Sequence, residues 1–166
     1  QELTQQMLND LSAYRKEIEE FLREKFGEEP TIRYGGSKAK GTMIKESYDL
    51  DIVCYFPRDC ERDIKDIYND VHKKLSEKYL VNPKTSALRI QKLGDDKIKL
   101  DYHIDAVPGR FVDDKKQESF LYVSQGEGSR IKTDLEKHIE FISKSGCVDI
   151  IKLGKLWRVR NNISLK

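Results

Sequence analysis

Two aspartates separated by one residue, Asp49 and Asp51, are the first candidates for chemistry in this sequence. Alternate residues of a β-strand face the same side, so both carboxylates would emerge together while Leu50 and Ile52 face the other side. Two negative charges held this close need a cation between them, and carboxylate oxygens suit Mg²⁺. The pair therefore indicates a divalent metal site. The alternative is a solvated pair on the wet face of an edge strand.

A second polar stripe follows in residues 97–107, where Asp101, His103 and Asp105 share one face of a predicted strand. This stripe could lie beside the strand of Asp49 and Asp51 and supply a third ligand. Spacing alone does not choose between Asp101 and Asp105. His103 could also be a ligand, although a hydrogen-bonded histidine is the commoner arrangement on a half-exposed strand.

The segment GGSKAKGT, residues 35–42, has the composition of a phosphate-binding turn. Gly36 allows close backbone approach, and Ser37 stands where a short helix would begin, so that backbone N–H groups favour an anion there. Lys40 adds positive charge. The alternative is an ordinary capped turn. A P-loop is not indicated, because Thr42 occupies the position where that motif requires its lysine.

Apolar spacing predicts the elements that would position these residues. A long amphipathic helix over residues 3–26 ends at Gly27. Strands are predicted over 31–34, 48–56, 86–93, 97–107 and 120–124, with a hairpin turn at 94–96 and a break at Pro108-Gly109. Further helices are expected around residues 64–75, 134–143 and 148–160. The predicted class is α+β (mixed α/β), a mixed twisted sheet flanked by helices.

Composition narrows the classes of protein to consider. The chain has 166 residues, the size of one domain, and its net charge of +2 does not mark a dedicated nucleic-acid binder. Its three cysteines have no C-x-x-C spacing, so neither a disulfide framework nor a zinc site is indicated. No apolar stretch approaches 18 residues and no charged-then-apolar leader precedes the first helix, so we expect a cytoplasmic protein without membrane contact.

Taken together, Gly36-Ser37, Gly41-Thr42 and Asp49-Leu50-Asp51 resemble the core motif of the polymerase-beta nucleotidyltransferase superfamily. In that motif a Gly-Ser is followed by three residues, a Gly-Thr, and an acidic pair two apart on the next strand. The third carboxylate of the family typically sits in a hydrophobic-Asp-x-x-Pro context, which residues 104–108 match. The resemblance therefore selects Asp105 rather than Asp101 as the third ligand.

Downstream, Lys155-Leu156-Trp157 is similar to the K-x-W element of oligoadenylate synthetases and bacterial cyclic-oligonucleotide synthases, in which the lysine helps hold the triphosphate. The alternative for Lys155 is a surface lysine on an amphipathic helix, and we expect Trp157 to pack in a core. The resemblance covers residues 31–158. It implies the nucleotidyltransferase fold, with a catalytic domain at residues 1–130 and the start of a helical second lobe, cut from a longer enzyme, at 131–166.

The resemblance also implies an activity. A nucleoside monophosphate would pass from an NTP, most simply ATP, to a hydroxyl acceptor on a nucleotide or RNA end, releasing pyrophosphate and making a linear or cyclic oligonucleotide signal. Two Mg²⁺ ions, replaceable by Mn²⁺, would be held by Asp49, Asp51 and Asp105. An activating ligand or partner protein would fit this reading. The nucleotide would be bound by five residues, Gly36, Ser37, Lys40, Thr42 and Lys155.

Three other functions compete with this one. They are a tRNA-terminal (CCA-adding) nucleotidyltransferase, an antibiotic nucleotidyltransferase that modifies an aminoglycoside hydroxyl, and a catalytically inactive nucleotide or RNA sensor. The modest charge of +2 favours a small-molecule signal over a tRNA substrate. The presence of all three aspartates argues against an inactive sensor.

Overall fold

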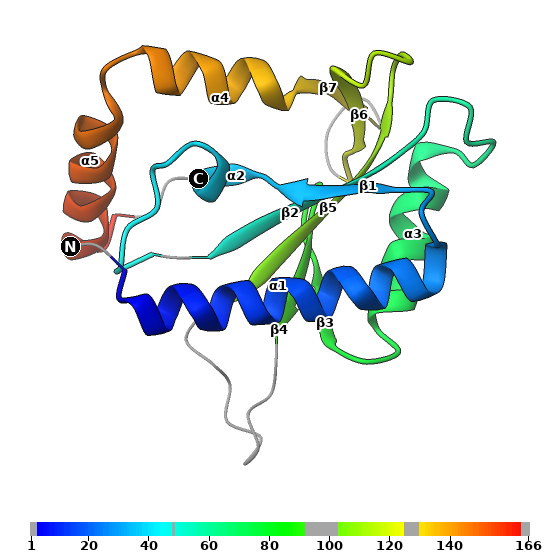
Figure 1. Ribbon diagram of the computed structural model, residues 1–166, viewed down its shortest axis with the longest axis horizontal. Helices are drawn as coiled ribbons and strands as arrows, with labels where there is room; N and C mark the ends of the chain where they lie inside the picture. Colours follow the sequence, from blue (N-terminus) through cyan, green and yellow to red (C-terminus); the bar gives the residue numbers. More distant parts are fainter. Residues whose placement is uncertain (1–2, 48, 92–102, 125–129, 164–166) are drawn as a thin grey trace.

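The computed structural model describes residues 3–47, 49–91, 103–124 and 130–163, which form a mixed α/β domain (Figure 1). Its helices are α1 (Gln5–Phe26), α2 (Gly36–Ala39), α3 (Ile64–Leu75), α4 (Leu135–Lys144) and α5 (Val148–Arg160). Its strands are β1 (Thr31–Tyr34), β2 (Leu50–Phe56), β3 (Leu80–Pro83), β4 (Leu88–Gln91), β5 (Ile104–Phe111), β6 (Glu118–Tyr122) and β7 (Arg130–Asp134). The predicted fold class is confirmed.

The strands form one mixed sheet in the order β1-β2-β5-β4-β3, and β6 and β7 extend it from β5. Only the central pair, β2 and β5, is parallel. The pairs β1–β2, β3–β4, β4–β5, β5–β6 and β6–β7 are antiparallel. Because β2 and β5 run in the same direction, the first residues of both strands lie at the same end of the sheet.

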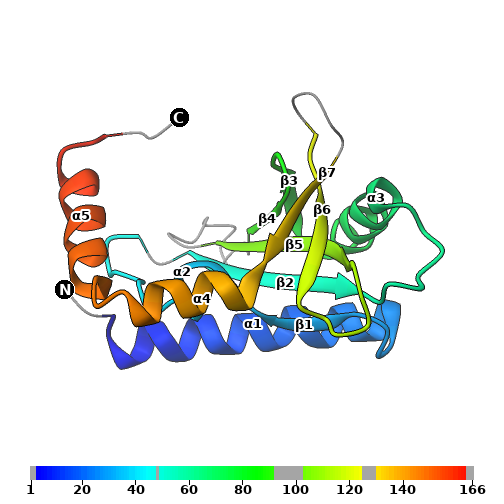
Figure 2. The same cartoon turned by 90° about the horizontal axis from the view of Figure 1, so that it is seen from above.

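Both faces of the sheet are covered, which explains why β2 is apolar along almost its whole length. The helices α1 and α3 pack on one face, where Leu22, Ile52 and Val71 belong to the larger core. On the other face, Val53 of β2 joins a smaller cluster with Leu135 of α4. In Figure 2, α1 lies under the sheet while β6, β7 and α4 cross its opposite side.

The first helix shows how local signals set the boundaries of these elements. The Thr4 hydroxyl accepts a hydrogen bond from the Met7 N–H at 3.3 Å, which satisfies one free donor of the first turn. At the other end Gly27 adopts a positive φ of 63° and its N–H donates to the Arg23 carbonyl. The helix that was predicted over residues 3–26 is confirmed as Gln5–Phe26.

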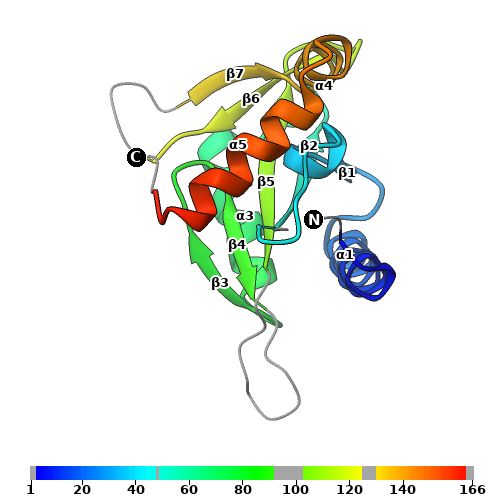
Figure 3. The same cartoon turned by 90° about the vertical axis from the view of Figure 1, so that its left-hand side faces the viewer.

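The last helix has a different environment. It crosses the end of the sheet at which β2 begins, as Figure 3 shows, and none of its residues is buried. The side chains of Ile150, Leu153 and Trp157 are 60–67% exposed. The expectation that Trp157 packs in a core is therefore wrong for the described chain, because no described segment covers this face. Among the described helices, none combines the length and the apolar character needed to cross a bilayer.

Several predicted boundaries differ from the structure. The strand predicted over 48–56 begins at Leu50, so Asp49 precedes it. Pro108-Gly109 does not break β5, because on the side away from β2 the pairing with β4 ends at Ala106 and that with β6 begins at Gly109. The missing N–H of Pro108 falls in this gap. Gly109 is needed there, since a Cβ would lie 2.8 Å from the Tyr55 ring.

Two strands had no sequence prediction and part of another lies outside the described chain. The short strands β3 and β7 are partly or fully exposed and show no clear alternation. The predicted hairpin turn at 94–96, and residues 97–102 with Asp101, lie outside the described residues. The antiparallel pairing of β4 with β5, in which Ile90 is opposite Ile104, agrees with the predicted hairpin.

Candidate active site

The two central strands bring two of the predicted carboxylates together. In the parallel register Asp51 of β2 is directly opposite Asp105 of β5. Their neighbours Leu50 and Ile104 are buried in the core, so the alternation of each strand directs both aspartates to the other face. Burial first, and then the negative charge of Asp105, raise the pKa of Asp51. The structure therefore holds the carboxylates of Asp51 and Asp105 close together at the end of the sheet where β2 and β5 begin.

The glycine turn approaches Asp51 so closely that no side chain fits between them. The N–H of Gly35 donates to the Asp51 carbonyl at 2.8 Å. Gly36 has a φ of 49°, and a Cβ built on it would lie 1.6 Å from Oδ2 of Asp51. The backbone N–H of Ser37 hydrogen-bonds to Asp51 and partly offsets the rise in its pKa. Glycine at position 36 is thus required by the carboxylate behind it.

Asp49 lies just before β2 and is bound to the histidine that precedes β5. Nδ1 of His103 is 3.0 Å from Oδ1 of Asp49, and Nε2 is 3.8 Å from Oδ1 of Asp105. The Nε2 atom is buried and has no hydrogen-bond partner among the described residues. His103 thus lies between the first and third aspartates.

Asp105 has a further partner that the sequence did not predict. Arg89 on β4 is opposite Asp105 in the antiparallel register. Its Nε donates to Oδ1 and its Nη2 donates to Oδ2, both at 2.9 Å. Hydrogen bonding to Asp105 is the main cause that raises the pKa of Arg89. This two-bond pair occupies both oxygens of the carboxylate.

All five residues predicted to bind the nucleotide line one cavity of about 240 Å³. Gly36 and Ser37 belong to α2. Lys40 and Thr42 belong to the loop that follows, and Lys155 belongs to α5. The cavity is completed by two side chains that sequence reasoning missed, Ile142 of α4 and Ile151 of α5. Only the docking of the last two helices near α2 brings these segments together, so no local sequence signal could have found the two isoleucines.

The lysine of α5 is held in place by Thr42. Nζ of Lys155 donates to the Thr42 carbonyl at 2.9 Å and to its hydroxyl at 3.2 Å. An ammonium group has three donors, so one is left for a ligand. Burial first, and then the positive charge of Lys40, lower the pKa of Lys155. Thr42 is itself buried, so its contribution to binding would act through the lysine.

A larger hollow of about 640 Å³ runs along α4, but it is a weaker candidate for chemistry. Its walls come from one helix and the residue after it, with Phe141 as the main apolar side chain. None of the predicted aspartates lines it. The smaller cavity beside α2 is the better candidate because the positive charge of two lysines adjoins the backbone that contacts Asp51.

The three aspartates fit a divalent cation in chemistry but not yet in arrangement. Oxygen ligands of high negative charge are what Mg²⁺ prefers, and a cation would offset both the burial and the charge of Asp105 that raise the pKa of Asp51. In the part of the chain that the structure describes, however, no three acidic, imidazole or thiol side chains converge on one point. Arg89 is hydrogen-bonded to Asp105 instead, and His103 lies beside Asp49.

The sequence matches the family model of the nucleotidyltransferase domain over residues 15–166. This match includes the glycine turn, all three aspartates and Lys155. The chain belongs to the nucleotidyltransferase domain family. No match was found among curated proteins.

Solved structures with the fold of this nucleotidyltransferase domain include several bacterial CD-NTases. The STING-associated CdnE c-di-GMP synthase of Capnocytophaga granulosa has a TM-score of 0.67 at 16% identity, covering 100% of this chain and 56% of its own. E. coli MS115-1 CdnC, solved with HORMA-deltaN, gives 0.65 at 21% identity over 94% of this chain and 52% of its own. Vibrio cholerae DncV, a cyclic AMP-GMP synthase, gives 0.57 at 21% over 78% and 40%. The chain thus spans about half of these relatives.

Proposed function

We propose that the complete protein is a Mg²⁺-dependent nucleotidyltransferase that moves a nucleoside monophosphate from an NTP to a hydroxyl acceptor and makes an oligonucleotide signal. One observation carries the proposal. The cavity lined by Ser37, Lys40 and Lys155 is bounded by the same Gly36 whose backbone contacts Asp51. A phosphate-sized positive cavity and a carboxylate cluster are therefore separated by a single glycine.

The charges of the cavity suit a triphosphate. Lys40 and Lys155 lie close enough for the charge of one to lower the pKa of the other. An anion placed between two ammonium groups removes this repulsion and gains a charge-assisted hydrogen bond from each. The Ser37 hydroxyl on the same wall can donate a further bond. These side chains would bind and orient the β- and γ-phosphates so that pyrophosphate leaves on their side.

On the other side of Gly36, Asp49, Asp51 and Asp105 would hold two Mg²⁺ ions, with Mn²⁺ as an alternative. When bound, such ions stabilise negative charge on the phosphates and lower the pKa of an acceptor hydroxyl. The protein itself supplies position: the paired strands fix Asp51 relative to Asp105, and Gly36 holds the turn against Asp51, so phosphates bound at the turn would lie close to the carboxylates. Positioning of reactants is a large part of such catalysis.

The nature of the product and of the partners follows from the relatives and is part of the proposal. The similar solved proteins include a c-di-GMP synthase and a cyclic AMP-GMP synthase, and a cyclic dinucleotide or related second messenger is accordingly proposed here. CdnC is solved in complex with HORMA-deltaN, so regulation by a partner protein is also proposed. The chain spans about half of these relatives, and we assign residues 131–166 to the start of a second lobe that would complete the cavity.

The test is product formation by the complete protein with each labelled NTP and Mg²⁺. Asp51→Asn and Asp105→Asn should each lower the rate by about a thousandfold or more, because each removes a ligand of ions that contribute several kcal/mol. Asp114→Asn is the matched control, since Asp114 is 88% exposed beside Arg58. Near-normal product formation by either site variant would refute the assignment.

A further inference from the structure

The bond between Arg89 and Asp105 has a consequence for metal binding. Both carboxylate oxygens of Asp105 accept from the guanidinium at 2.9 Å, and a two-bond pair of this kind is among the strongest side-chain contacts. The negative charges of Asp49 and Asp51 also act on Arg89 and contribute to its raised pKa. Arg89 therefore lies within the field of all three aspartates and stays positively charged.

Each of the other two aspartates also has a partner within the protein. Nδ1 of His103 lies 3.0 Å from Asp49, and the backbone N–H of Ser37 hydrogen-bonds to Asp51. Among these partners only Arg89 is a permanent cation, because a backbone amide is neutral and a guanidinium does not lose its proton in proteins. Arg89 also occupies Asp105, the carboxylate proposed to complete the site of the second Mg²⁺ ion.

We propose that Arg89 is a built-in counter-cation, a positioning residue that holds Asp105 while no metal is bound and competes with divalent ions for it. The inference rests on the function proposed above. The guanidinium cancels part of the negative charge that would attract an ion. A triphosphate bound in the neighbouring cavity adds negative charge and so restores the attraction for a metal ion. Metal and nucleotide therefore bind together, and the free ion binds weakly.

The geometry also indicates how Asp105 changes partners. Arg89 approaches from β4, on the side of β5 opposite to β2 and Asp51. A carboxylate has about four lone-pair sites, so Asp105 can keep one bond to Arg89 while it offers an oxygen towards Asp51. The side chain of Arg89 is 31% exposed, which lets the guanidinium move without disturbing the core.

The test is Mn²⁺ binding to the complete protein by calorimetry, with no nucleotide present. Arg89→Gln should bind Mn²⁺ at least about tenfold more tightly than the unmodified protein, because the competing charge is gone. Arg89→Lys keeps the charge without the two-bond geometry and should fall between them. The matched control, Arg58→Gln, removes an exposed arginine that is paired with Asp114 away from the site, and it should leave the affinity unchanged. With a non-hydrolysable NTP bound, the gap between Arg89→Gln and the unmodified protein should narrow.

Three outcomes are decisive beyond the expected one. If Arg89→Gln, shown to be folded by circular dichroism, binds Mn²⁺ as the unmodified protein does, the counter-cation role is overturned. Weaker binding would overturn it too, because Arg89 would then support the metal site. In both cases the proposed function stands as long as Asp51→Asn abolishes Mn²⁺ binding. If Asp51→Asn binds Mn²⁺ normally, both the inference and the metal assignment fall.

Discussion

The two ends of the β2–β5 pair both carry charged groups, yet the protein treats them differently. At one end Asp51 is opposite Asp105, and burial first, then the like charge of Asp105, raise the pKa of Asp51. At the other end Phe56 is opposite Arg110, beside a group of side chains in which opposite charges meet. The same pair of strands thus ends in a cluster of like charges, the carboxylate end, and in a cluster where opposite charges meet, the arginine end.

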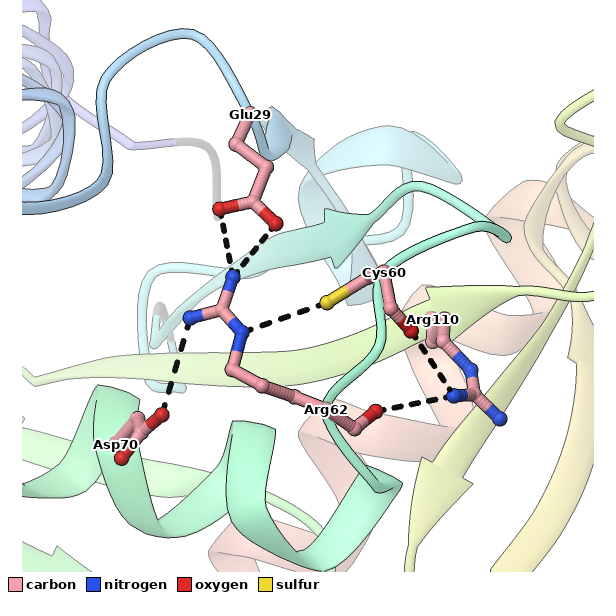
Figure 4. A network of polar contacts seen from close by, with 5 residues as sticks. All are labelled: Glu29, Cys60, Arg62, Asp70 and Arg110. Carbon is pink, nitrogen blue, oxygen red and sulfur yellow. Dashed lines mark hydrogen bonds and ion pairs between the residues drawn. The ribbon is translucent and has the colours of Figure 1, made fainter.

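The arginine end, with Arg62 and Arg110, is shown in Figure 4. Nη2 of Arg62 lies 2.6 Å from both Glu29 oxygens, and Nη1 is 3.8 Å from Asp70. Its guanidinium also stacks 4.5 Å from the Phe56 ring centre, and Arg110 donates to the Cys60 and Arg62 carbonyls. Here each of the residues shown has at least one partner of complementary character among the described residues.

The difference between the two ends separates stability from function. Repulsion between neighbouring carboxylates persists only where the surrounding structure enforces it, and such sites are typically functional. The carboxylate end would gain by binding a cation, whereas the arginine end would gain nothing. Substitutions at the two ends should therefore change different properties, and this gives three ways to test the contrast.

The largest effect is expected from Gly36→Ala. The added Cβ would lie 1.6 Å from Oδ2 of Asp51, so the carboxylate or the turn must move by an ångström or more, which costs about a hundredfold in rate or more. Gly41→Ala is the matched control, because Gly41 has a similar φ of 67° but open space around it. Both variants should lose the stability that a positive φ costs an alanine, Gly36→Ala should lose more because of its contact with Asp51, and only Gly36→Ala should lose activity. Equal rates in the two variants would show that the close approach has no catalytic role.

An intermediate effect, on stability alone, is expected from Arg62→Met. The substitution keeps the aliphatic stem but removes the contacts to Glu29 and the Phe56 ring, at a cost of about 1–2 kcal/mol in the free energy of unfolding. Arg58→Met, at a 59% exposed arginine, should change it by less than about 0.5 kcal/mol. Urea unfolding measures both. A loss of activity at full folding in Arg62→Met would contradict the division between the two ends.

The smallest effect concerns the pH dependence of stability at the carboxylate end. The folded pKa of Asp51 is raised above 3.8, chiefly by burial, so the folded state binds this proton more tightly than the unfolded state. Ionisation therefore destabilises the fold, and the penalty appears as pH rises through the folded pKa. Without metal, Asp51→Asn should be more stable at pH 7 by on the order of 1 kcal/mol.

The acid side of the same experiment supplies the check. The gain from Asp51→Asn should shrink as the pH falls towards 3.8 and vanish below it, where the carboxyl is protonated in both states. Asp134→Asn should show the opposite sign, because the N–H of Lys137 lowers the pKa of Asp134 at the start of α4. That variant should lose stability at neutral pH and recover it in acid. A pH-independent gain in Asp51→Asn would mean that ionisation of the carboxylate is not its cause.

Much of the fold could be predicted from the sequence because several elements carry strong local signals. The apolar spacing of α1 and α3 predicted both helices, and the turn at Gly27 set a boundary. The strand β1 was predicted at its observed residues. The strands β3 and β7 were not predicted, because short strands with exposed side chains lack the alternation that burial imposes. The passage of β5 through Pro108 depends on which neighbours pair with it, and this is not a local property.

The residues of the candidate site were likewise predicted only in part. Residue spacing and the family resemblance predicted Asp49, Asp51 and Asp105 and five nucleotide-binding residues, and the structure brings those five to one cavity. Neither identified Arg89, whose pairing with Asp105 depends on the antiparallel register of β4 and β5. Parity on β4 could have suggested a partner, but the register could not be read from spacing alone.

The helices α3 and α5 show most directly what each level of information decides. Both have apolar residues at helical spacing, and both were predicted from it. On α3 that face is buried, with Ile67 and Val71 inaccessible to solvent, while on α5 Leu153 and Trp157 remain exposed. The sequence alone determined where helices form and which side chains carry charge, since these depend on neighbours a few residues apart. Only the tertiary structure decided which apolar faces are covered and which charges meet, because burial and Coulomb energy depend on distances in space.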